Sequence, residues 1–173
     1  MSFTTLGKLF LPALAILTLT AGVYRGDRLT VTFPDDWSAP EADSDGIVSV
    51  KQGENGANCN VETKEVAAIA DMTLPEINDE YAHVFDVAEW ADFLGLEPAE
   101  ITLLESDIRP LGDAFFHIAT MRVKANADVM AITRYGFYVL PGRVVMAGCY
   151  VEESLYPIYT SQFEATVSSL RPW

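Results

Sequence analysis

Two consecutive segments, residues 114–124 and 129–140, carry apolar side chains at both odd and even positions. Successive side chains of a strand point to opposite faces of its sheet, so this pattern gives the sheet two apolar faces. In the first segment, one face would hold Phe115 and the other Phe116 and Ile118. Each apolar face needs a covering layer. The pattern therefore favours folds in which a sheet lies between two layers.

Short apolar or alternating runs, bounded by turn residues such as Gly53 and Gly112, predict further strands. These are residues 29–33, 47–51, 58–66, 101–109 and 143–151. The last four strands of the chain are joined by short loops, which is typical of an antiparallel meander. We therefore predict an antiparallel sheet of about six or seven strands in an α+β fold.

Between residues 73 and 95, apolar residues recur at the spacing of a helix. Thr73 precedes Pro75, a pattern typical of a helix start with proline in the first turn. Asp86 precedes Glu89 by three residues, which is the spacing of a capping box. Gly95 suits the left-handed residue just past a helix end. The sequence therefore predicts helical structure in two segments here.

The C-terminal region predicts one more helix. Phe163, Val167 and Leu170 recur at helical spacing, with Pro157 near the start and Pro172 past the end. This helix and the middle helical region can each cover one face of the sheet. The expected architecture is an α/β/α sandwich.

Two local motifs accompany this order of elements. Residues 33–37, Phe-Pro-Asp-Asp-Trp, close the first strand, and residues 163–170 read Phe-Glu-Ala-Thr-Val-Ser-Ser-Leu. Over residues 29–171 the chain resembles the PsbP-like α/β/α sandwich superfamily, which includes extrinsic photosystem subunits and a nuclear-import GTPase-binding factor. The resemblance implies a fold and a role in binding or assembly. It implies no catalytic residue, because the superfamily shares none.

The N-terminus has the pattern of a secretory signal. Lys8 is the only charged residue among the first 24, an apolar run follows it, and small residues end at Gly22. We predict a signal peptide over residues 1–22 and a single exported domain over residues 23–173, periplasmic or secreted. An uncleaved membrane anchor and a buried N-terminal helix are the alternatives.

The chain has two cysteines, Cys59 and Cys149. Export would place them where disulfides persist. Strand alternation puts Cys149 on the face of Ala147 and Cys59 on the face of Val61, so both thiols would face apolar surroundings. We predict a disulfide between them. Two separate buried thiols are the alternative.

The charge excludes several partners. Lys and Arg number 11 against 25 Asp and Glu, for a formal charge of −14. Binding to nucleic acid or to an anionic membrane needs clustered basic residues. We therefore expect no nucleic-acid partner, and membrane association only if the N-terminal segment stays uncleaved. Removal of that segment would take away Lys8 and leave the domain more acidic still.

Catalytic and metal motifs are missing from the sequence. The only imidazoles, His83 and His117, do not stand at metal-ligand spacing from the cysteines. No nucleophile elbow, phosphate loop or dinucleotide glycine pattern is present. We expect no enzyme activity, no metal and no cofactor. The alternative is a ligand-binding protein or enzyme with a pocket near His117.

Aromatic residues are the remaining candidates for a functional surface. Trp37, Tyr156 and Tyr159, together with His117, are candidate binding or interface residues, because such side chains combine large apolar area with a polar tip. Ordinary core packing is the alternative for each. The combined prediction is an exported, non-enzymatic accessory domain that binds a protein partner or assists assembly at a membrane face.

Overall fold

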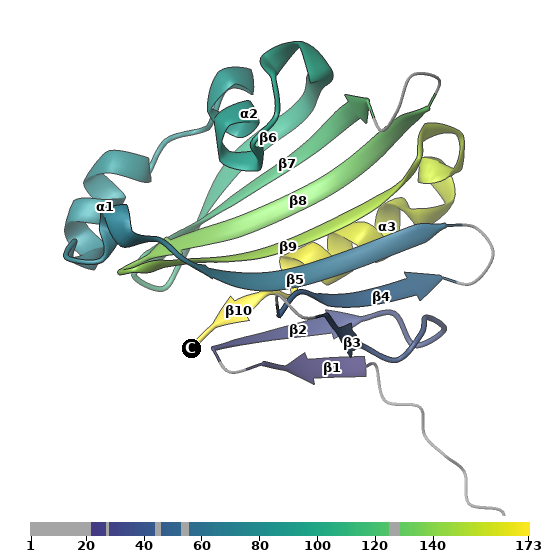
Figure 1. Ribbon diagram of the computed structural model, residues 1–173, viewed down its shortest axis with the longest axis horizontal. Coiled ribbons are helices and arrows are strands. Elements are labelled where there is room, and N and C mark those ends of the chain that lie inside the picture. Colours follow the sequence, from purple (N-terminus) through teal and green to yellow (C-terminus); the bar gives the residue numbers. More distant parts are fainter. Residues whose placement is uncertain (1–21, 27, 44–45, 53–55, 125–128) are drawn as a thin grey trace, which may run out of the picture.

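A seven-stranded antiparallel sheet forms the centre of the molecule, in the order β3-β4-β5-β9-β8-β7-β6 (Figure 1). The computed structural model describes residues 22–26, 28–43, 46–52, 56–124 and 129–173. The strands of this sheet are β3 (Glu41–Ala42), β4 (Val48–Gln52), β5 (Ala57–Glu65), β6 (Ile101–Leu111), β7 (Ala114–Lys124), β8 (Met130–Leu140) and β9 (Arg143–Glu152). Strands β6 to β9 pair in chain order, which confirms the predicted meander.

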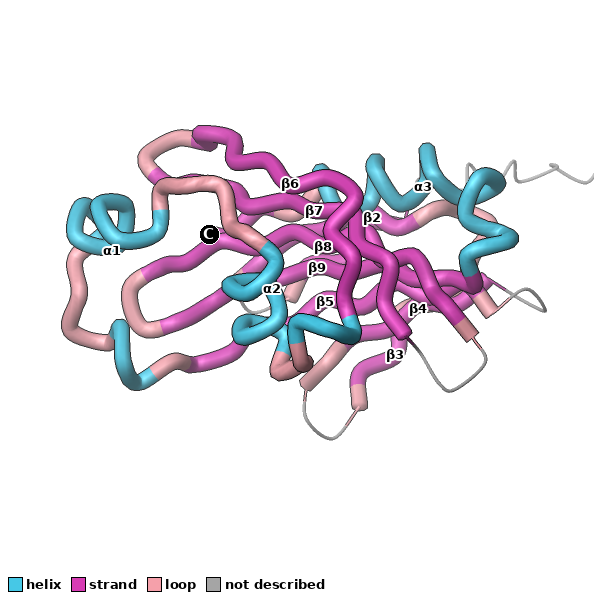
Figure 2. Tube along the Cα trace, turned by 90° about the horizontal axis from the view of Figure 1, so that it is seen from above, coloured by secondary structure: helices cyan, strands magenta, loops and turns pink. Residues whose placement is uncertain are grey.

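Helices cover both faces of this sheet. They are α1 (Leu74–Tyr81), α2 (Val87–Leu94) and α3 (Tyr156–Ser168), with 3₁₀ turns at Ala67–Ile69, Pro98–Glu100 and Glu153–Leu155. From above, α1 lies at one end of the long strands and α3 toward the other (Figure 2). The α/β/α sandwich is confirmed, and the predicted ends of the main strands agree with the structure to within two residues.

Two separate apolar cores lie on the two faces. On the α3 side, Phe163 and Val167 pack with Phe116 and Ile118. On the α1/α2 side, the core contains these buried residues: Ile77, Phe85, Trp90, Met121 and Phe137. Alternate residues of β7 therefore enter different cores, as the two-sided apolar pattern of residues 114–124 predicts.

The predicted caps position α1 and α2. The Thr73 backbone N–H donates to Glu76 Oε2 at 2.8 Å, and a second capping box joins Asp86 and Glu89. Gly95 ends α2 with a φ of 68°. Such caps satisfy backbone groups that a helix end leaves without partners. They fix both ends of α2 beside the sheet.

The predicted disulfide between Cys59 and Cys149 is present. The two residues lie directly opposite each other on β5 and β9, with their Cα atoms 4.0 Å apart. Both are fully buried on the α3 side, beside Val61 and Ala147. The disulfide links residues that are 90 positions apart in the sequence and so joins the N-terminal strands to the meander.

A smaller sheet is the main addition to the predicted fold. It has the order β1-β2-β10, formed by β1 (Gly22–Arg25), β2 (Leu29–Phe33) and β10 (Arg171–Pro172). The Thr32 backbone N–H donates to Ser169 Oγ at 2.8 Å, which ties β2 to the end of α3. The predicted signal segment lies outside the described residues except for Gly22, which begins β1.

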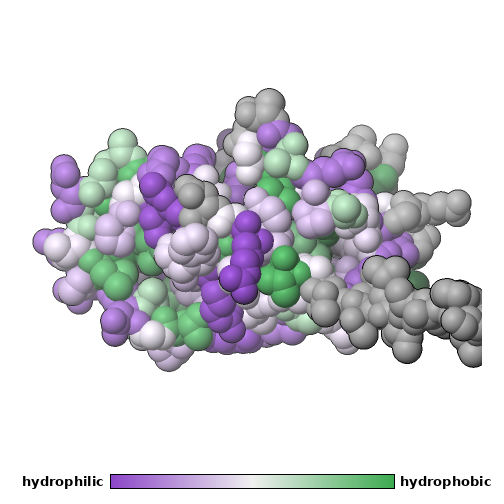
Figure 3. All heavy atoms as spheres, turned by 90° about the horizontal axis from the view of Figure 1, so that it is seen from below, coloured by the Kyte–Doolittle hydropathy of each residue, from purple (hydrophilic) through white to green (hydrophobic). Residues whose placement is uncertain are grey.

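The surface seen from below carries apolar side chains in separate patches between hydrophilic ones, where grey atoms do not cover it (Figure 3). Among the described residues, no helix has the length and apolar character that crossing a membrane requires.

Candidate functional site

Trp37 and Tyr159, two of the predicted interface residues, lie in the α3-side core. The indole of Trp37 is 8% exposed and packs edge-on against Tyr159, with ring centroids 6.0 Å apart, and against Phe163, at 6.2 Å. The hydroxyl of Tyr159 donates to Gln52 Oε1 at 2.9 Å. Both side chains contribute to packing and present little surface to a partner.

Tyr156 is half-buried at the start of α3. Its ring lies 6.1 Å from that of Phe163, and the nearby Ile158 is 70% exposed. A role for Tyr156 in an interface stays a prediction.

His117 lies in the α1/α2-side core and is 2% exposed. Its ring stacks on Phe137 at 4.7 Å and lies 4.6 Å from the ring of Phe85. Its Nδ1 has no hydrogen-bond partner among the described residues. Burial lowers the pKa of His117 to about 4, so the imidazole is neutral at physiological pH. A ligand site at His117 stays a prediction.

His83 lies on the surface between α1 and α2. Its Nε2 is 2.6 Å from Glu89 Oε1. Hydrogen bonds from His83 and from the Asp86 backbone N–H lower the pKa of Glu89. His83 therefore helps to hold the segment that leads into α2.

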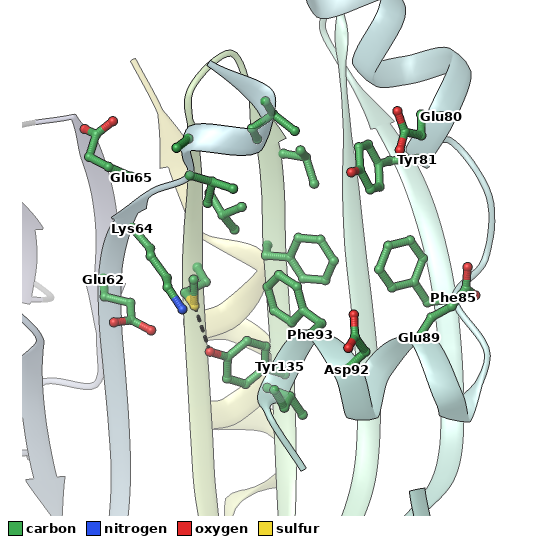
Figure 4. A pocket seen from close by; sticks show the side chains of 18 of the residues that line it. Glu62, Lys64, Glu65, Glu80, Tyr81, Phe85, Glu89, Asp92, Phe93 and Tyr135 are labelled. Atoms are coloured by element: carbon green, nitrogen blue, oxygen red, sulfur yellow. Dashed lines mark hydrogen bonds between the residues drawn. The ribbon is translucent and has the colours of Figure 1, made fainter. Parts of the chain in front are cut away.

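An open cavity lies on the α1/α2 side, near the alternative ligand site at His117, although His117 does not line it. It has a volume of about 840 Å³ and runs between β5 and the two helices (Figure 4). We call it the α1/α2 cleft. Its apolar floor is formed mainly by these residues: Phe93, Tyr135, Phe137, Val139, Val144 and Met146.

Aromatic contacts fix the floor of the α1/α2 cleft. Phe93 stacks on Phe137 with ring centroids 4.0 Å apart, and the hydroxyl of Tyr135 donates to Met146 Sδ at 3.0 Å (Figure 4). Gly148 makes room for Tyr135, because a Cβ there would lie 2.4 Å from a ring carbon of the tyrosine. Burial raises the pKa of the Tyr135 phenol, which stays protonated.

Carboxylates line both sides of the α1/α2 cleft (Figure 4). Among the described lining residues, the acidic ones are Glu62 and Glu65 on β5, Glu80 on α1, and Glu89 and Asp92 on α2. The basic lining residues in the same part of the chain are Lys64 and His83. Burial raises the pKa of Glu62, and the charge of nearby Lys64 partly opposes that effect. The cleft is thus apolar at its floor and anionic at its rim.

The α1/α2 cleft is lined by apolar, acidic and basic side chains. The described lining residues include no Ser, Thr or Cys that could act as a nucleophile. Nowhere in the described ranges do three or more metal-ligating side chains come together. An apolar floor with a charged rim can bind an amphipathic partner.

The α3 side carries an ionic network centred on Arg134. Arg134 is 4% exposed and lies 2.8 Å from Glu105 and 2.6 Å from Glu164. It also donates to Thr120 Oγ1 at 2.7 Å. Because Glu164 belongs to α3 and Arg134 to β8, this network fixes the helix on the sheet.

Sequence reasoning missed the α1/α2 cleft as a site. Nothing in the sequence indicates that α1 lies opposite β5, because the two are separate segments of the chain. The available signal was Glu62 and Lys64, charged residues at alternate positions on a strand whose other face is apolar. That alternation predicts a sheet face that no helix fully covers.

Comparison with solved structures supports the fold described above. Neither a family model nor a curated protein matches the sequence. The solution structure of cyanobacterial PsbP from Synechocystis sp. PCC 6803 is similar, with a TM-score of 0.57 and 14% identity over 97% of this chain and 99% of that one. The chain has a PsbP-like fold. The sequence resemblance is confirmed at the level of the fold.

Two other solved structures are less similar to this chain. A Bacteroides thetaiotaomicron protein has a TM-score of 0.47 and 9% identity, over 84% of this chain and 45% of that one. A Pseudomonas aeruginosa protein of unknown function has a TM-score of 0.45 and 11% identity, over 82% and 89%.

Proposed function

We propose that this protein is an exported, non-enzymatic accessory domain that binds a protein partner through the α1/α2 cleft. The observation that carries the proposal is the apolar floor of this cleft, where Phe93 and Tyr135 are only partly buried. Partly exposed aromatic residues within a charged rim are typical of protein interfaces. The PsbP-like fold supports a role in assembly at a membrane face.

Export is part of the same proposal. The Cys59–Cys149 disulfide suits an oxidising compartment, and the predicted signal over residues 1–22 supplies a route to it. The mature domain would then comprise residues 23–173. N-terminal sequencing of protein recovered outside the cytoplasm should give a start near Val23, whereas a start at Met1 would favour the membrane anchor.

Site-specific photo-crosslinking in the native host tests the binding surface. A photo-reactive amino acid replaces Asp92 on the rim of the cleft or, as the control, Asp36 in the turn after β2. We expect one protein to crosslink from position 92 and not from position 36, and the purified partner to bind the purified protein. A partner captured equally from both positions, or no partner at position 92, contradicts the proposal.

A further inference from the structure

The two sides of the α1/α2 cleft carry charge of the same sign. Glu62 lies on the β5 side, and Glu80 and Asp92 lie on the helix side (Figure 4). In the described part of the chain, none of these three has an ion-pair partner within 4.0 Å. Lys64 partly balances the charge of Glu62. The charges of Glu80 and Asp92, which are exposed, remain available to a binding partner.

The basic residues at the cleft offset only part of the negative charge of its rim. Among the described lining residues, Lys64 is the one lysine. The imidazole of His83 contacts the carboxylate of Glu89. Glu65 pairs with Arg28 at 2.9 Å, which neutralises one rim carboxylate. The remaining excess of carboxylates repels an anionic partner and attracts a cationic one.

The floor and rim together specify an amphipathic occupant. An apolar side chain can pack on Phe93 and Tyr135 while basic side chains reach carboxylates on both sides of the cleft. A guanidinium or ammonium group can also lie over these aromatic rings. The rim residues Lys64, Glu80 and Asp92 are exposed, so the cleft would leave much of an occupant in water. Sites for small molecules usually enclose most of their ligand, so an open cleft favours a segment of a larger partner.

We propose, on the basis of the protein-binding function above, that the α1/α2 cleft binds a basic segment of the partner, with Lys or Arg residues flanking an apolar anchor. The anchor occupies the floor at Phe93 and Tyr135. The flanking cations pair with Glu62 on one side and with Glu80 and Asp92 on the other.

Fluorescence anisotropy with the purified full chain tests this specificity. The probes are a short labelled peptide of lysine, leucine and tryptophan, a second with glutamate in place of lysine, and a third with serine in place of the apolar residues. We expect the first to bind at least about tenfold more tightly than the other two, and its binding to weaken with salt. Equal binding of the three peptides contradicts the proposal.

Two charge-matched variants locate the effect. The cleft variant is the triple substitution Glu62→Gln, Glu80→Gln and Asp92→Asn. The control removes the same charge outside the cleft, through Asp35→Asn, Asp36→Asn and Glu41→Gln. We expect the cleft variant to bind the basic peptide about tenfold more weakly and the control to change by less than about twofold. Equal losses in both variants would assign the binding to overall charge and overturn the proposal.

Other outcomes separate this inference from the proposed function. Crosslinking of an acidic or neutral partner segment from position 92 would support the proposed protein-binding function. It would contradict the inference that the bound segment is basic. Binding of the small cation benzyltrimethylammonium, without binding of the basic peptide, would contradict a partner segment. Binding of the basic peptide that the cleft variant abolishes, with no protein captured from position 92, would contradict the proposed function alone.

Discussion

The two faces of the seven-stranded sheet are covered to different degrees. On one face, α3 and β2 form a closed layer, in which Phe163 is fully buried and Arg134 is fixed by carboxylates. On the other face, α1 and α2 have eight residues each and leave an open cleft with Phe93 partly exposed. The same strands supply both cores. The closed side therefore buries more of its apolar side chains, and the open side leaves part of its apolar surface accessible.

The largest effect is expected from the closed side. Phe163→Ala removes a fully buried ring between Trp37 and the sheet and should lower the free energy of unfolding by about 3–5 kcal/mol. Phe93→Ala, the matched truncation in the cleft, should cost less because its ring is only partly buried. Urea denaturation measures both, and equal losses would contradict the contrast between the faces.

Loss of the disulfide should come next. A double substitution, Cys59→Ala and Cys149→Ala, should lower the free energy of unfolding by about 2–5 kcal/mol, because the unfolded chain loses a crosslink between distant residues. Binding at the α1/α2 cleft should persist below the new melting temperature, since the bond lies on the α3 side. Loss of binding in a folded double variant would show that the two faces are coupled.

Low pH should destabilise the folded protein, because it favours protonation of His117 in the α1/α2-side core. The folded protein lowers the pKa of His117 from 6.5 to about 4, so the unfolded state binds a proton at higher pH than the folded state. Stability from this group is complete above pH 6.5 and declines by about 3 kcal/mol as the pH falls to 4. Unfolding measured across this range should show a shallower decline in His117→Phe. If the free energy of unfolding fell as steeply with pH in His117→Phe as in the wild type, His117 would not be the source of this pH dependence.

The smallest effect on stability is expected at the rim of the cleft. The triple variant Glu62→Gln, Glu80→Gln and Asp92→Asn should change the free energy of unfolding by no more than about 0.5 kcal/mol per site, because these carboxylates lack ion-pair partners among the described residues. Thermal unfolding checks this. A large loss of stability would mean that the rim serves the fold instead of binding.

Local sequence patterns predicted much of this fold. Thr73, Asp86 and Gly95 mark helix ends through interactions within a few residues. The alternation around Cys59 and Cys149 predicted that both side chains face apolar surroundings, as they do. These features depend on backbone geometry close in the sequence. The predicted layers followed from the two long strands with apolar residues on both faces.

Features that depend on distant pairing were not predictable from the sequence. β10 is only two residues long and pairs with β2 from the opposite end of the described chain, whereas β1 is a short strand that pairs with β2 next to it in the sequence. The cleft likewise requires β5 to face α1 and α2, which are separate segments of the sequence. Trp37 and Tyr159 were candidates for an interface by residue type, but which aromatic residues stay accessible depends on how α3 packs.

Nuclear magnetic resonance of the backbone amides, recorded as the basic peptide is added, tests most directly whether the open face is the binding face. We predict chemical-shift changes centred on Glu62, Lys64 and the α2 residues Glu89, Asp92 and Phe93, with α3 unchanged. Changes centred on α3 or β2, with the cleft unchanged, would contradict the assignment of binding to the open face.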